Sequence, residues 1–271
     1  MKKLTGLALG LLFLVPTLAF SDSFSLRIGY FMPSALSDAY LASHPDSLWA
    51  IELNQMSFTK EKFRGTMLGF SYEYFVGKNL SLALTLDSYS RNKPGYYIDY
   101  VQNTLEEWDF AFPYADFYGD DIQHAFSVSS TPLQISLKIT PLGRKTRLIP
   151  FVGGGAGLYF YSVRIYGQTV NFGDRSWFYD FETETAYSNP DDPNLRDQQI
   201  YPVEQVNGRE KGSVFGYHAF AGFQIPIGFR ATIEAEARYH WAKAKFTEWF
   251  LDFDDFDIGG LALTVGFNYW F

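Results

Sequence analysis

The sequence predicts an all-β fold, an eight-stranded antiparallel up-and-down transmembrane β-barrel with four long extracellular loops. Beyond residue 22, apolar and polar residues alternate over segments of about ten residues, the length that a tilted strand needs to cross a bilayer. Aromatic residues make up 19% of the chain, although the mean hydropathy is only -0.12. The apolar residues are therefore dispersed among polar ones. The connections between the segments alternate strictly between long and short.

Residues 1–21 differ from the rest of the chain. They begin with two lysines, continue with an apolar run that ends at Pro16, and finish with small residues at the two positions that a signal peptidase reads. The apolar run is too short to be a membrane anchor. We predict a cleavable signal peptide over 1–21, with cleavage before Asp22 and a barrel domain over 22–271.

The charge and the cysteine content exclude several classes of protein. The chain has 22 Lys and Arg against 30 Asp and Glu. Without Lys2 and Lys3 the balance is 20 against 30, a net charge of -10, which does not suit nucleic-acid binding. There is no cysteine, so disulfide scaffolds, thiolate metal sites and cysteine nucleophiles are excluded. We expect no cofactor.

The expected strands of the N-terminal half show their apolar residues on one face. In 80–90, for example, the sequence LSLALTLDSYS places Leu82, Leu84 and Leu86 on the same side. The four strands expected in this half cover residues 24–32, 65–76, 80–90 and 126–140.

The second half repeats the pattern with strands over 148–161, 213–225, 231–241 and 260–271. The short connections are 77–79, 141–147 and 226–228, and the long ones are 33–63, 91–124, 162–212 and 246–259. Short periplasmic turns and long extracellular loops are typical of outer-membrane barrels. Within the third long connection, residues 172–187 fit an extra extracellular hairpin better than two more spanning strands, because they carry several charges.

Residues 231–241, ATIEAEARYHW, place four ionisable side chains on one face of a strand. In a membrane barrel the apolar face meets lipid, so these side chains point inward. An eight-stranded barrel is only wide enough for its own side chains to fill it. We therefore expect a structural plug of ion pairs and hydrogen bonds rather than a pore. The predicted plug residues are Arg27, Glu73, Asp87, Lys138, Glu234, Glu236, Arg238 and His240.

Two other patterns carry less weight. A catalytic role for Glu234 and Glu236 is disfavoured, because two carboxylates on one face say little by themselves. The glycine run 153–157 lacks a following Lys-Ser/Thr and a helix, so it is not a phosphate-binding loop. Close packing inside a narrow barrel explains the glycines.

The segments 149–161, 215–228 and 259–271 resemble the small outer-membrane β-barrel superfamily, which includes the transmembrane domain of OmpA and the OmpW-like proteins. The resemblance implies the barrel fold and an outer-membrane location. The final aromatic residues look like the C-terminal signal that the barrel-assembly machinery reads. These residues are Phe267, Tyr269 and Phe271.

The superfamily includes anchors, adhesins, narrow channels and a few lipid-modifying enzymes. Outer-membrane lipid A deacylases resemble this size class and pair His and Ser two residues apart on one strand face. Here His124 is followed by Ser127, and that odd separation sends the two side chains to opposite faces. We therefore expect no enzyme.

A group of basic residues follows the outward register past the extracellular ends of three neighbouring strands. Basic side chains offer charge-assisted hydrogen bonds to phosphate, so the group is a candidate lipopolysaccharide-phosphate patch. Ordinary flanking charge at a membrane edge is an equally good interpretation. The five residues are Arg164, Arg209, Lys211, Lys243 and Lys245.

The run LDFDDFD at 251–257 offers oxygen ligands for a divalent cation. Its spacing lacks the EF-hand pattern, so a solvated acidic loop tip is the favoured interpretation and we expect no metal site. The weak candidates are Asp252, Asp254, Asp255 and Asp257.

The leading functional hypothesis is a non-enzymatic outer-membrane protein, a rigid barrel with a structural or surface-interaction role. The alternative is an OmpW-like narrow channel or transporter for small apolar molecules, and a lipid A-modifying enzyme is the third. The expected partners are outer-membrane lipid, lipopolysaccharide and the barrel-assembly machinery, and we expect a monomer.

Overall fold

The computed structural model describes most of the chain beyond residue 21. The described residues are 22–36, 42–45, 49, 53, 56–57, 63–96, 122–170, 177–180, 185–188, 199–200, 203–251 and 253–271. The predicted signal peptide, residues 1–21, lies outside them. In this part of the chain, no helix has the length and apolar character needed to cross a membrane.

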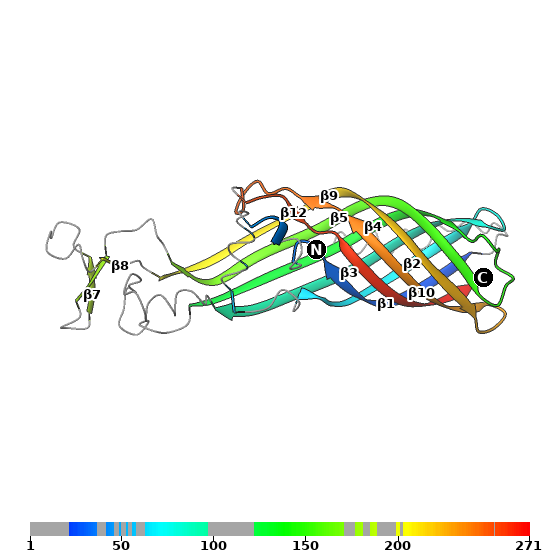
Figure 1. Cartoon of the computed structure of the whole chain (residues 1–271), viewed down its shortest axis with the longest axis horizontal. Helices are drawn as coiled ribbons and strands as arrows, with labels where there is room; N and C mark the ends of the chain where they lie inside the picture. Colours follow the sequence, from blue (N-terminus) through cyan, green and yellow to red (C-terminus); the bar gives the residue numbers. More distant parts are fainter. Residues whose placement is uncertain are drawn as a thin grey trace, which may run out of the picture.

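Eight strands close into one antiparallel barrel, in which each strand lies beside the next along the chain (Figure 1). The first strand pairs with the last, Leu26 opposite Phe267, and this pairing closes the cylinder. The predicted eight-stranded antiparallel β-barrel is confirmed. The strands are β1 (Ser23–Pro33), β2 (Gly65–Phe75), β3 (Leu80–Tyr96), β4 (Gln123–Ile139), β5 (Ile149–Val170), β9 (Val203–Pro226), β10 (Ala231–Trp241) and β13 (Gly260–Trp270).

The barrel has two different ends. Three short turns, 76–79, 140–148 and 227–230, lie at the end that also holds the C-terminus, which we call the turn end (Figure 1). Short turns fix the register of the strands that they join, and a slip by one residue would send every side chain to the other face. In the first turn, the Asn79 side chain donates to the carbonyl oxygens of Thr140 and Pro141 at 2.7 and 3.0 Å, which joins two neighbouring turns.

The polarity of the barrel wall is inverted relative to a soluble barrel. Apolar side chains cover the outside, and Leu26 and Ile135 are 65% and 64% exposed. Arg27 and Gln134, their chain neighbours, are 2% and 0% exposed inside the barrel. Exposing so much apolar surface is stable only where the surroundings are apolar, which makes this a transmembrane barrel.

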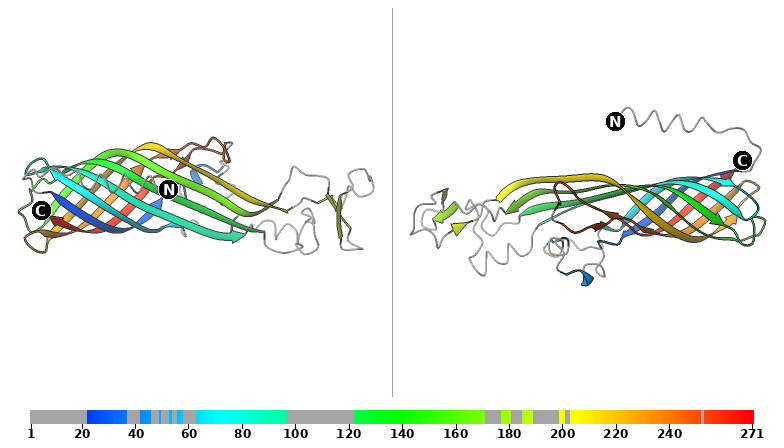
Figure 2. Two further views of the ribbon diagram at one scale, coloured as in Figure 1. Left: turned by 180° about the vertical axis from the view of Figure 1, so that it is seen from behind. Right: turned by 90° about the horizontal axis from the view of Figure 1, so that it is seen from above.

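Four strands are longer than the sequence pattern indicated. β3, β4, β5 and β9 extend past the ends of the others, away from the turn end (Figure 2). The expected loops 91–124 and 162–212 were therefore wrong in part, because strands occupy 91–96, 123–124, 162–170 and 203–212.

The reason is a reversal of the alternation within single strands. Up to Phe160 the outward residues of β5 are apolar, but beyond it the inward residues are apolar and the outward ones polar. Tyr161, Val163 and Ile165 are buried, while Ser162 and Arg164 face outward. The strand continues into water with the polarity of a soluble sheet. A strand predicted from one constant apolar face therefore ends too early, near residue 160 in β5.

Among the described residues, five short strands lie outside the barrel. β6 (Trp177–Asp180) and β7 (Thr185–Ser188) pair as an antiparallel hairpin, and β8 (Gln199–Ile200) joins them in a separate sheet. The extra-hairpin interpretation of 172–187 is thus confirmed for the paired residues, and these strands take no part in the barrel. β11 (Lys243–Ala244) pairs with β12 (Phe256–Asp257).

Candidate functional site

The barrel interior is the candidate site, because most of the buried ionisable side chains lie there. The structure brings all eight predicted interior residues into it, each 1% to 7% exposed. Five different strands supply the seven charged groups, which we call the interior ion network: Arg27 from β1, Glu73 from β2, Asp87 from β3, Lys138 from β4, and Glu234, Glu236 and Arg238 from β10.

Glu236 lies at the centre of this network. Arg27 donates from Nη2 to both carboxylate oxygens of Asp87, at 2.7 and 2.8 Å, and from Nη1 to Glu236 Oε1 at 2.9 Å. Arg238 donates from Nε to the same Glu236 oxygen at 2.8 Å. One carboxylate thus separates two guanidinium groups, and the Arg238 guanidinium also lies over the Phe220 ring at 4.4 Å.

Nearer the turn end, Lys138 joins two carboxylates. Its Nζ donates to Glu73 Oε2 at 3.1 Å and to Glu234 Oε2 at 2.8 Å. Gln224 donates to the same Glu234 oxygen at 2.7 Å. Arg144, in a short turn, has its Nη2 3.9 Å from Glu73 Oε1. Every charge of the network therefore has an opposite charge beside it, as burial requires.

A hydrogen-bond chain continues from Arg238 toward the other end of the barrel. Arg238 Nη1 donates to Gln134 Oε1 at 2.6 Å, which fixes the orientation of that amide. Gln134 Nε2 lies 2.9 Å from both Tyr159 OH and His240 Nδ1. Because an amide nitrogen only donates, Nδ1 of His240 accepts and the ring proton lies on Nε2. His240 therefore enters the network as a neutral imidazole.

Glycines in β5 let these long side chains fit. A Cβ atom at Gly153 would overlap the Phe220 ring and the Leu137 carbonyl oxygen, and one at Gly155 would overlap the Ile135 carbonyl oxygen. The glycine run 153–157 thus serves close packing of strands and interior side chains, in agreement with the sequence argument.

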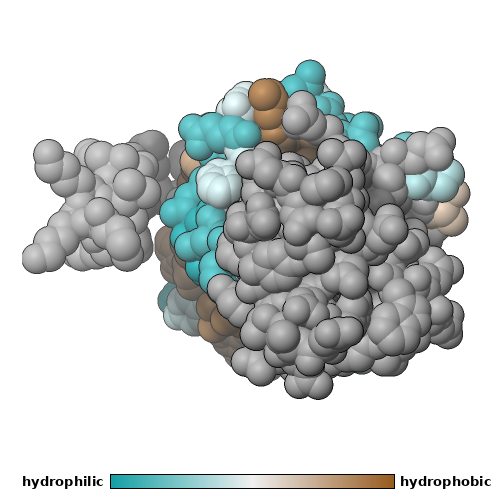
Figure 3. All heavy atoms as spheres, turned by 90° about the vertical axis from the view of Figure 1, so that its left-hand side faces the viewer, coloured by the Kyte–Doolittle hydropathy of each residue, from teal (hydrophilic) through white to brown (hydrophobic). Residues whose placement is uncertain are grey.

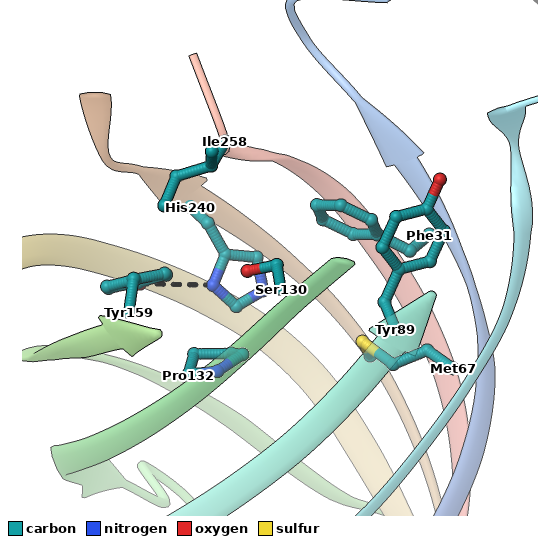
Figure 4. Close-up of a pocket in the computed structure, with 8 residues that line it drawn as sticks. All are labelled: Phe31, Met67, Tyr89, Ser130, Pro132, Tyr159, His240 and Ile258. Carbon is teal, nitrogen blue, oxygen red and sulfur yellow. Dashed lines mark hydrogen bonds between the residues drawn. The ribbon is translucent and has the colours of Figure 1, made fainter. Parts of the chain in front are cut away.

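Two small cavities lie among the described interior residues. One cavity of about 10 Å³ lies beside His240 and Tyr159, and a second of similar volume lies within the ion network. Each has room for about one water molecule. Figure 4 shows the first cavity between the His240–Tyr159 hydrogen bond and an apolar side formed by Phe31, Tyr89 and Met67.

The sequence analysis did not predict an aromatic cluster that lies on the side of the ion network away from the turn end. Trp49, from the connection between β1 and β2, is only 1% exposed, and its indole Nε1 donates to the Asp254 carbonyl oxygen at 2.8 Å. Five phenylalanine rings surround it, with centroids 4.5 to 5.9 Å away. We call this cluster the aromatic cap: Trp49, Phe126, Phe246, Phe250, Phe253 and Phe256.

Only one signal in the sequence could have revealed the cap. The run LDFDDFD repeats phenylalanine between aspartates, which is an unusual composition for a solvated loop. Trp49 itself lies in a segment without periodicity.

The acidic candidates do not form a metal site in the part of the chain that the structure describes, where no group of three or more potential ligands converges. Asp252 lies outside the described residues, and Asp254 and Asp255 are exposed. Asp257 accepts a hydrogen bond from the Gly259 backbone N–H at 2.8 Å. Burial raises the pKa of its carboxyl group, against the opposing effects of that hydrogen bond and Lys243.

The remaining predicted residues lie on the outer surface. Arg164 and Arg209 are cross-strand partners on β5 and β9. Lys211 is the next residue on the same face of β9. Lys243 and Lys245 are exposed after β10, and Lys243 pairs in register with Asp257. The C-terminal aromatic side chains are exposed on the outer face of the wall, at 50%, 45% and 53% for Phe267, Tyr269 and Phe271.

Fold and interior together define a small transmembrane β-barrel of the kind found in bacterial outer membranes. No family model and no curated protein matches the sequence. Among solved structures, Neisserial surface protein A is 10% identical with a TM-score of 0.42, over 93% of this chain and 97% of that chain. *Escherichia coli* outer membrane protein W is 15% identical with a TM-score of 0.39, over 94% and 100%. The N-terminal barrel of *Pseudomonas aeruginosa* OprF is 10% identical with a TM-score of 0.36, over 92% and 97%. At these identities and TM-scores, none of the similarities supports a statement about function.

Proposed function

We propose that the protein is a non-enzymatic outer-membrane barrel with a sealed lumen, which acts as a rigid scaffold for the segments that it presents at the cell surface. The observation that carries this proposal is the filled interior. The ion network occupies the lumen within the membrane, and the aromatic cap occupies it above. A lumen closed by two layers supports a structural or surface-interaction role better than conduction.

An outer-membrane location agrees with the apolar outer wall. Closed β-barrels of this size satisfy their backbone hydrogen bonds without an edge, so they can cross a bilayer. The exposure of Phe267, Tyr269 and Phe271 on the outer wall supports a proposed role as the signal that the barrel-assembly machinery recognises. Cell fractionation tests this location, and recovery in the inner membrane would reject it.

A non-enzymatic role is supported by the lack of access to reactive groups. Ser136 Oγ lies 2.7 Å from His218 Nε2, which resembles half of a hydrolytic dyad. Both residues are buried, at 1% and 3% exposure, so solvent reaches neither reactive atom freely. Mass spectrometry of lipid A from cells with and without the protein should show the same species.

Single-channel recording tests the sealed lumen. The purified protein in planar bilayers should give no discrete conductance steps, because ions would have to displace paired charges and packed aromatic rings. A general porin in the same bilayers serves as the positive control. Regular channel openings from the wild-type protein would overturn the proposal.

A channel for small apolar molecules is the second candidate, and one observation favours it. The upper lumen is lined by apolar side chains, including Phe31, Met67 and Tyr89 around the cavity in Figure 4. An apolar solute could pass only if the aromatic cap moved. Faster uptake of a small apolar fluorophore by cells that make the protein than by cells that lack it would support this candidate.

A further inference from the structure

Beyond the apolar belt, the outer faces of β3, β4, β5 and β9 continue as one polar surface. The strand registers align its residues in rows that cross all four strands. The first row beyond the belt is Ser90, Ser129, Ser162 and Lys211, and the second row is Asn92, Ser127, Arg164 and Arg209.

The charge of this surface is opposite to that of the whole chain. The two rows carry three cations and no carboxylate, although the chain has a net charge of -8. Within the described residues, no carboxylate forms an ion pair with Arg164, Arg209 or Lys211. We call these three residues the basic face.

Two of these cations lie directly opposite each other. Arg164 and Arg209 are cross-strand neighbours, an arrangement that destabilises a sheet when the charges are alike. Each guanidinium is held in place by a neutral group. Arg164 Nε donates to Asn207 Oδ1 at 2.9 Å, and Arg209 Nε donates to Ser162 Oγ at 3.1 Å. Both terminal nitrogens of each arginine are left to bind an anion that would offset the repulsion.

The Arg164 side chain is also stacked. Its guanidinium lies over the Tyr166 ring at 4.2 Å, and the Tyr166 hydroxyl accepts a hydrogen bond from Asn92 Nδ2 at 2.8 Å. A guanidinium that is fixed on a ring loses less freedom when it binds a ligand. The basic face is therefore partly ordered before any anion arrives.

The basic face lies beyond the end of the apolar belt, on the side away from the turn end. Phe160 and Phe215 are the last apolar residues on the outer faces of β5 and β9, at 46% and 56% exposure. On the outer face of β9, the residue after Phe215 in the direction away from the turn end is Ser213, and the next one is Lys211. Same-face residues are about 7 Å apart along a strand, and the tilt of barrel strands reduces the vertical step to about 5 Å. The cations thus lie roughly 10 to 15 Å above the apolar belt. In the end-on view of Figure 3, hydrophilic atoms lie nearer the viewer than the hydrophobic atoms along one side of the molecule.

We propose that the basic face binds the phosphate groups of lipopolysaccharide through Arg164, Arg209 and Lys211. Guanidinium groups bind phosphate with paired, charge-assisted hydrogen bonds, and the serine hydroxyls of the first row can donate to sugar or phosphate oxygens. This proposal rests on the outer-membrane location proposed above. Lys243 pairs in register with Asp257, which brings a carboxylate to the same pair of strands, so it is left out of the basic face. Lys245 is also left out, because its backbone carbonyl accepts a hydrogen bond from the inward-facing Tyr161 hydroxyl at 2.9 Å.

The test measures lipopolysaccharide binding to the purified full-length mature protein in detergent. The variant Arg164→Gln/Arg209→Gln/Lys211→Gln should bind phosphorylated lipopolysaccharide about tenfold more weakly, or worse, than the wild type. Wild-type binding should weaken to the same degree when the lipopolysaccharide is dephosphorylated, and should weaken with added salt.

A matched control removes three cations from the turn end. Lys78, Lys145 and Arg147 are exposed there, and K78Q/K145Q/R147Q changes the net charge by the same amount. This variant should bind like the wild type. Equal losses in both variants would show a general charge effect and overturn the proposal, as would wild-type affinity in the basic-face variant. Inorganic phosphate that competes fully at equal phosphate concentration would assign the face to free phosphate and also overturn it.

Cell fractionation separates this proposal from the one on which it rests. Unchanged lipopolysaccharide affinity in the basic-face variant, with the wild type in the outer membrane, rejects the phosphate site and leaves the proposed function intact. A wild-type protein found outside the outer membrane would reject both.

Discussion

At the scale of single residues, Glu236 is the side chain on which most interior contacts depend. Its carboxylate accepts hydrogen bonds from both Arg27 and Arg238. It is the carboxylate that lies between the two guanidinium groups. All three side chains are at most 6% exposed, so bulk solvent does not hydrate their charges. Removal of one partner from a buried charge group is costly because the remaining charges stay buried.

We therefore predict that Glu236→Ala destabilises the barrel by about 3–5 kcal/mol. Two guanidinium groups would face each other without the carboxylate that separates them. Equilibrium unfolding in urea from detergent or lipid measures the loss.

The control for this prediction is Glu248→Ala, which removes an exposed carboxylate. Its unfolding free energy should stay within about 0.5 kcal/mol of the wild type. Coinciding unfolding curves for Glu236→Ala and the wild type would mean that the interior ion network contributes nothing to stability.

How far the sequence can predict the interior is clear from these same residues. Alternation assigns Glu234, Glu236 and Arg238 to one face, because side chains on a strand alternate strictly. It gives no information about partners. Arg27 and Glu236 are 209 positions apart in sequence, and only closure of the barrel brings them together.

At the scale of structural elements, the reversal of polarity along β5 explains both the length of the strand and the position of the basic face. The outward residues of β5 change from apolar to polar beyond Phe160, while Tyr161, Val163 and Ile165 continue the inward face with buried apolar side chains. The boundary between the two patterns corresponds to the edge of the apolar belt. A strand that crosses from lipid into water needs both patterns, since the apolar side must face lipid in one part and protein in the other.

Apart from Phe126 on β4, the aromatic cap is built from connections that have no repeating pattern. Trp49 comes from one connection, and Phe246, Phe250 and Phe256 come from another more than 190 residues later. Such a cluster depends on long-range packing, so local periodicity cannot reveal it.

We predict that Trp49→Ala loosens the cap while the barrel stays folded. The loss of a buried indole leaves a cavity, which costs about 3–5 kcal/mol where the neighbours cannot close it. Trypsin should then cleave at Lys243 or Lys245 markedly faster, and unfolding of the barrel in urea should change little.

Trp249→Ala is the matched control, because Trp249 is 58% exposed. Its proteolysis should resemble that of the wild type. If Trp49→Ala is cleaved no faster than this control, the cap does not hold the 242–259 connection in place.

At the scale of the whole molecule, the inverted polarity of the wall distinguishes this barrel from a soluble one. Leu263 is 46% exposed in the apolar belt, opposite Tyr30 on one side and Ala237 on the other. In water an exposed leucine tolerates replacement by arginine, whereas a charge in the middle of a bilayer must lose its hydration.

We predict that Leu263→Arg destabilises the protein in lipid bilayers by about 2–4 kcal/mol. Leu251→Arg, at a position that is 64% exposed beyond the barrel, should have almost no effect. Equilibrium unfolding in vesicles compares the two variants, and equal stabilities would contradict the transmembrane orientation of the wall.

The sequence by itself determined the number of strands, their order and the face that each turns to lipid. These are local properties, since a period of two residues and the length of a connection can both be recognised within a short segment. The tertiary structure decided which interior charges pair, how far four strands extend past the others, and how Trp49 packs among the phenylalanine rings of the aromatic cap. These features depend on contacts between residues far apart in the chain, and such contacts exist only after the barrel has closed.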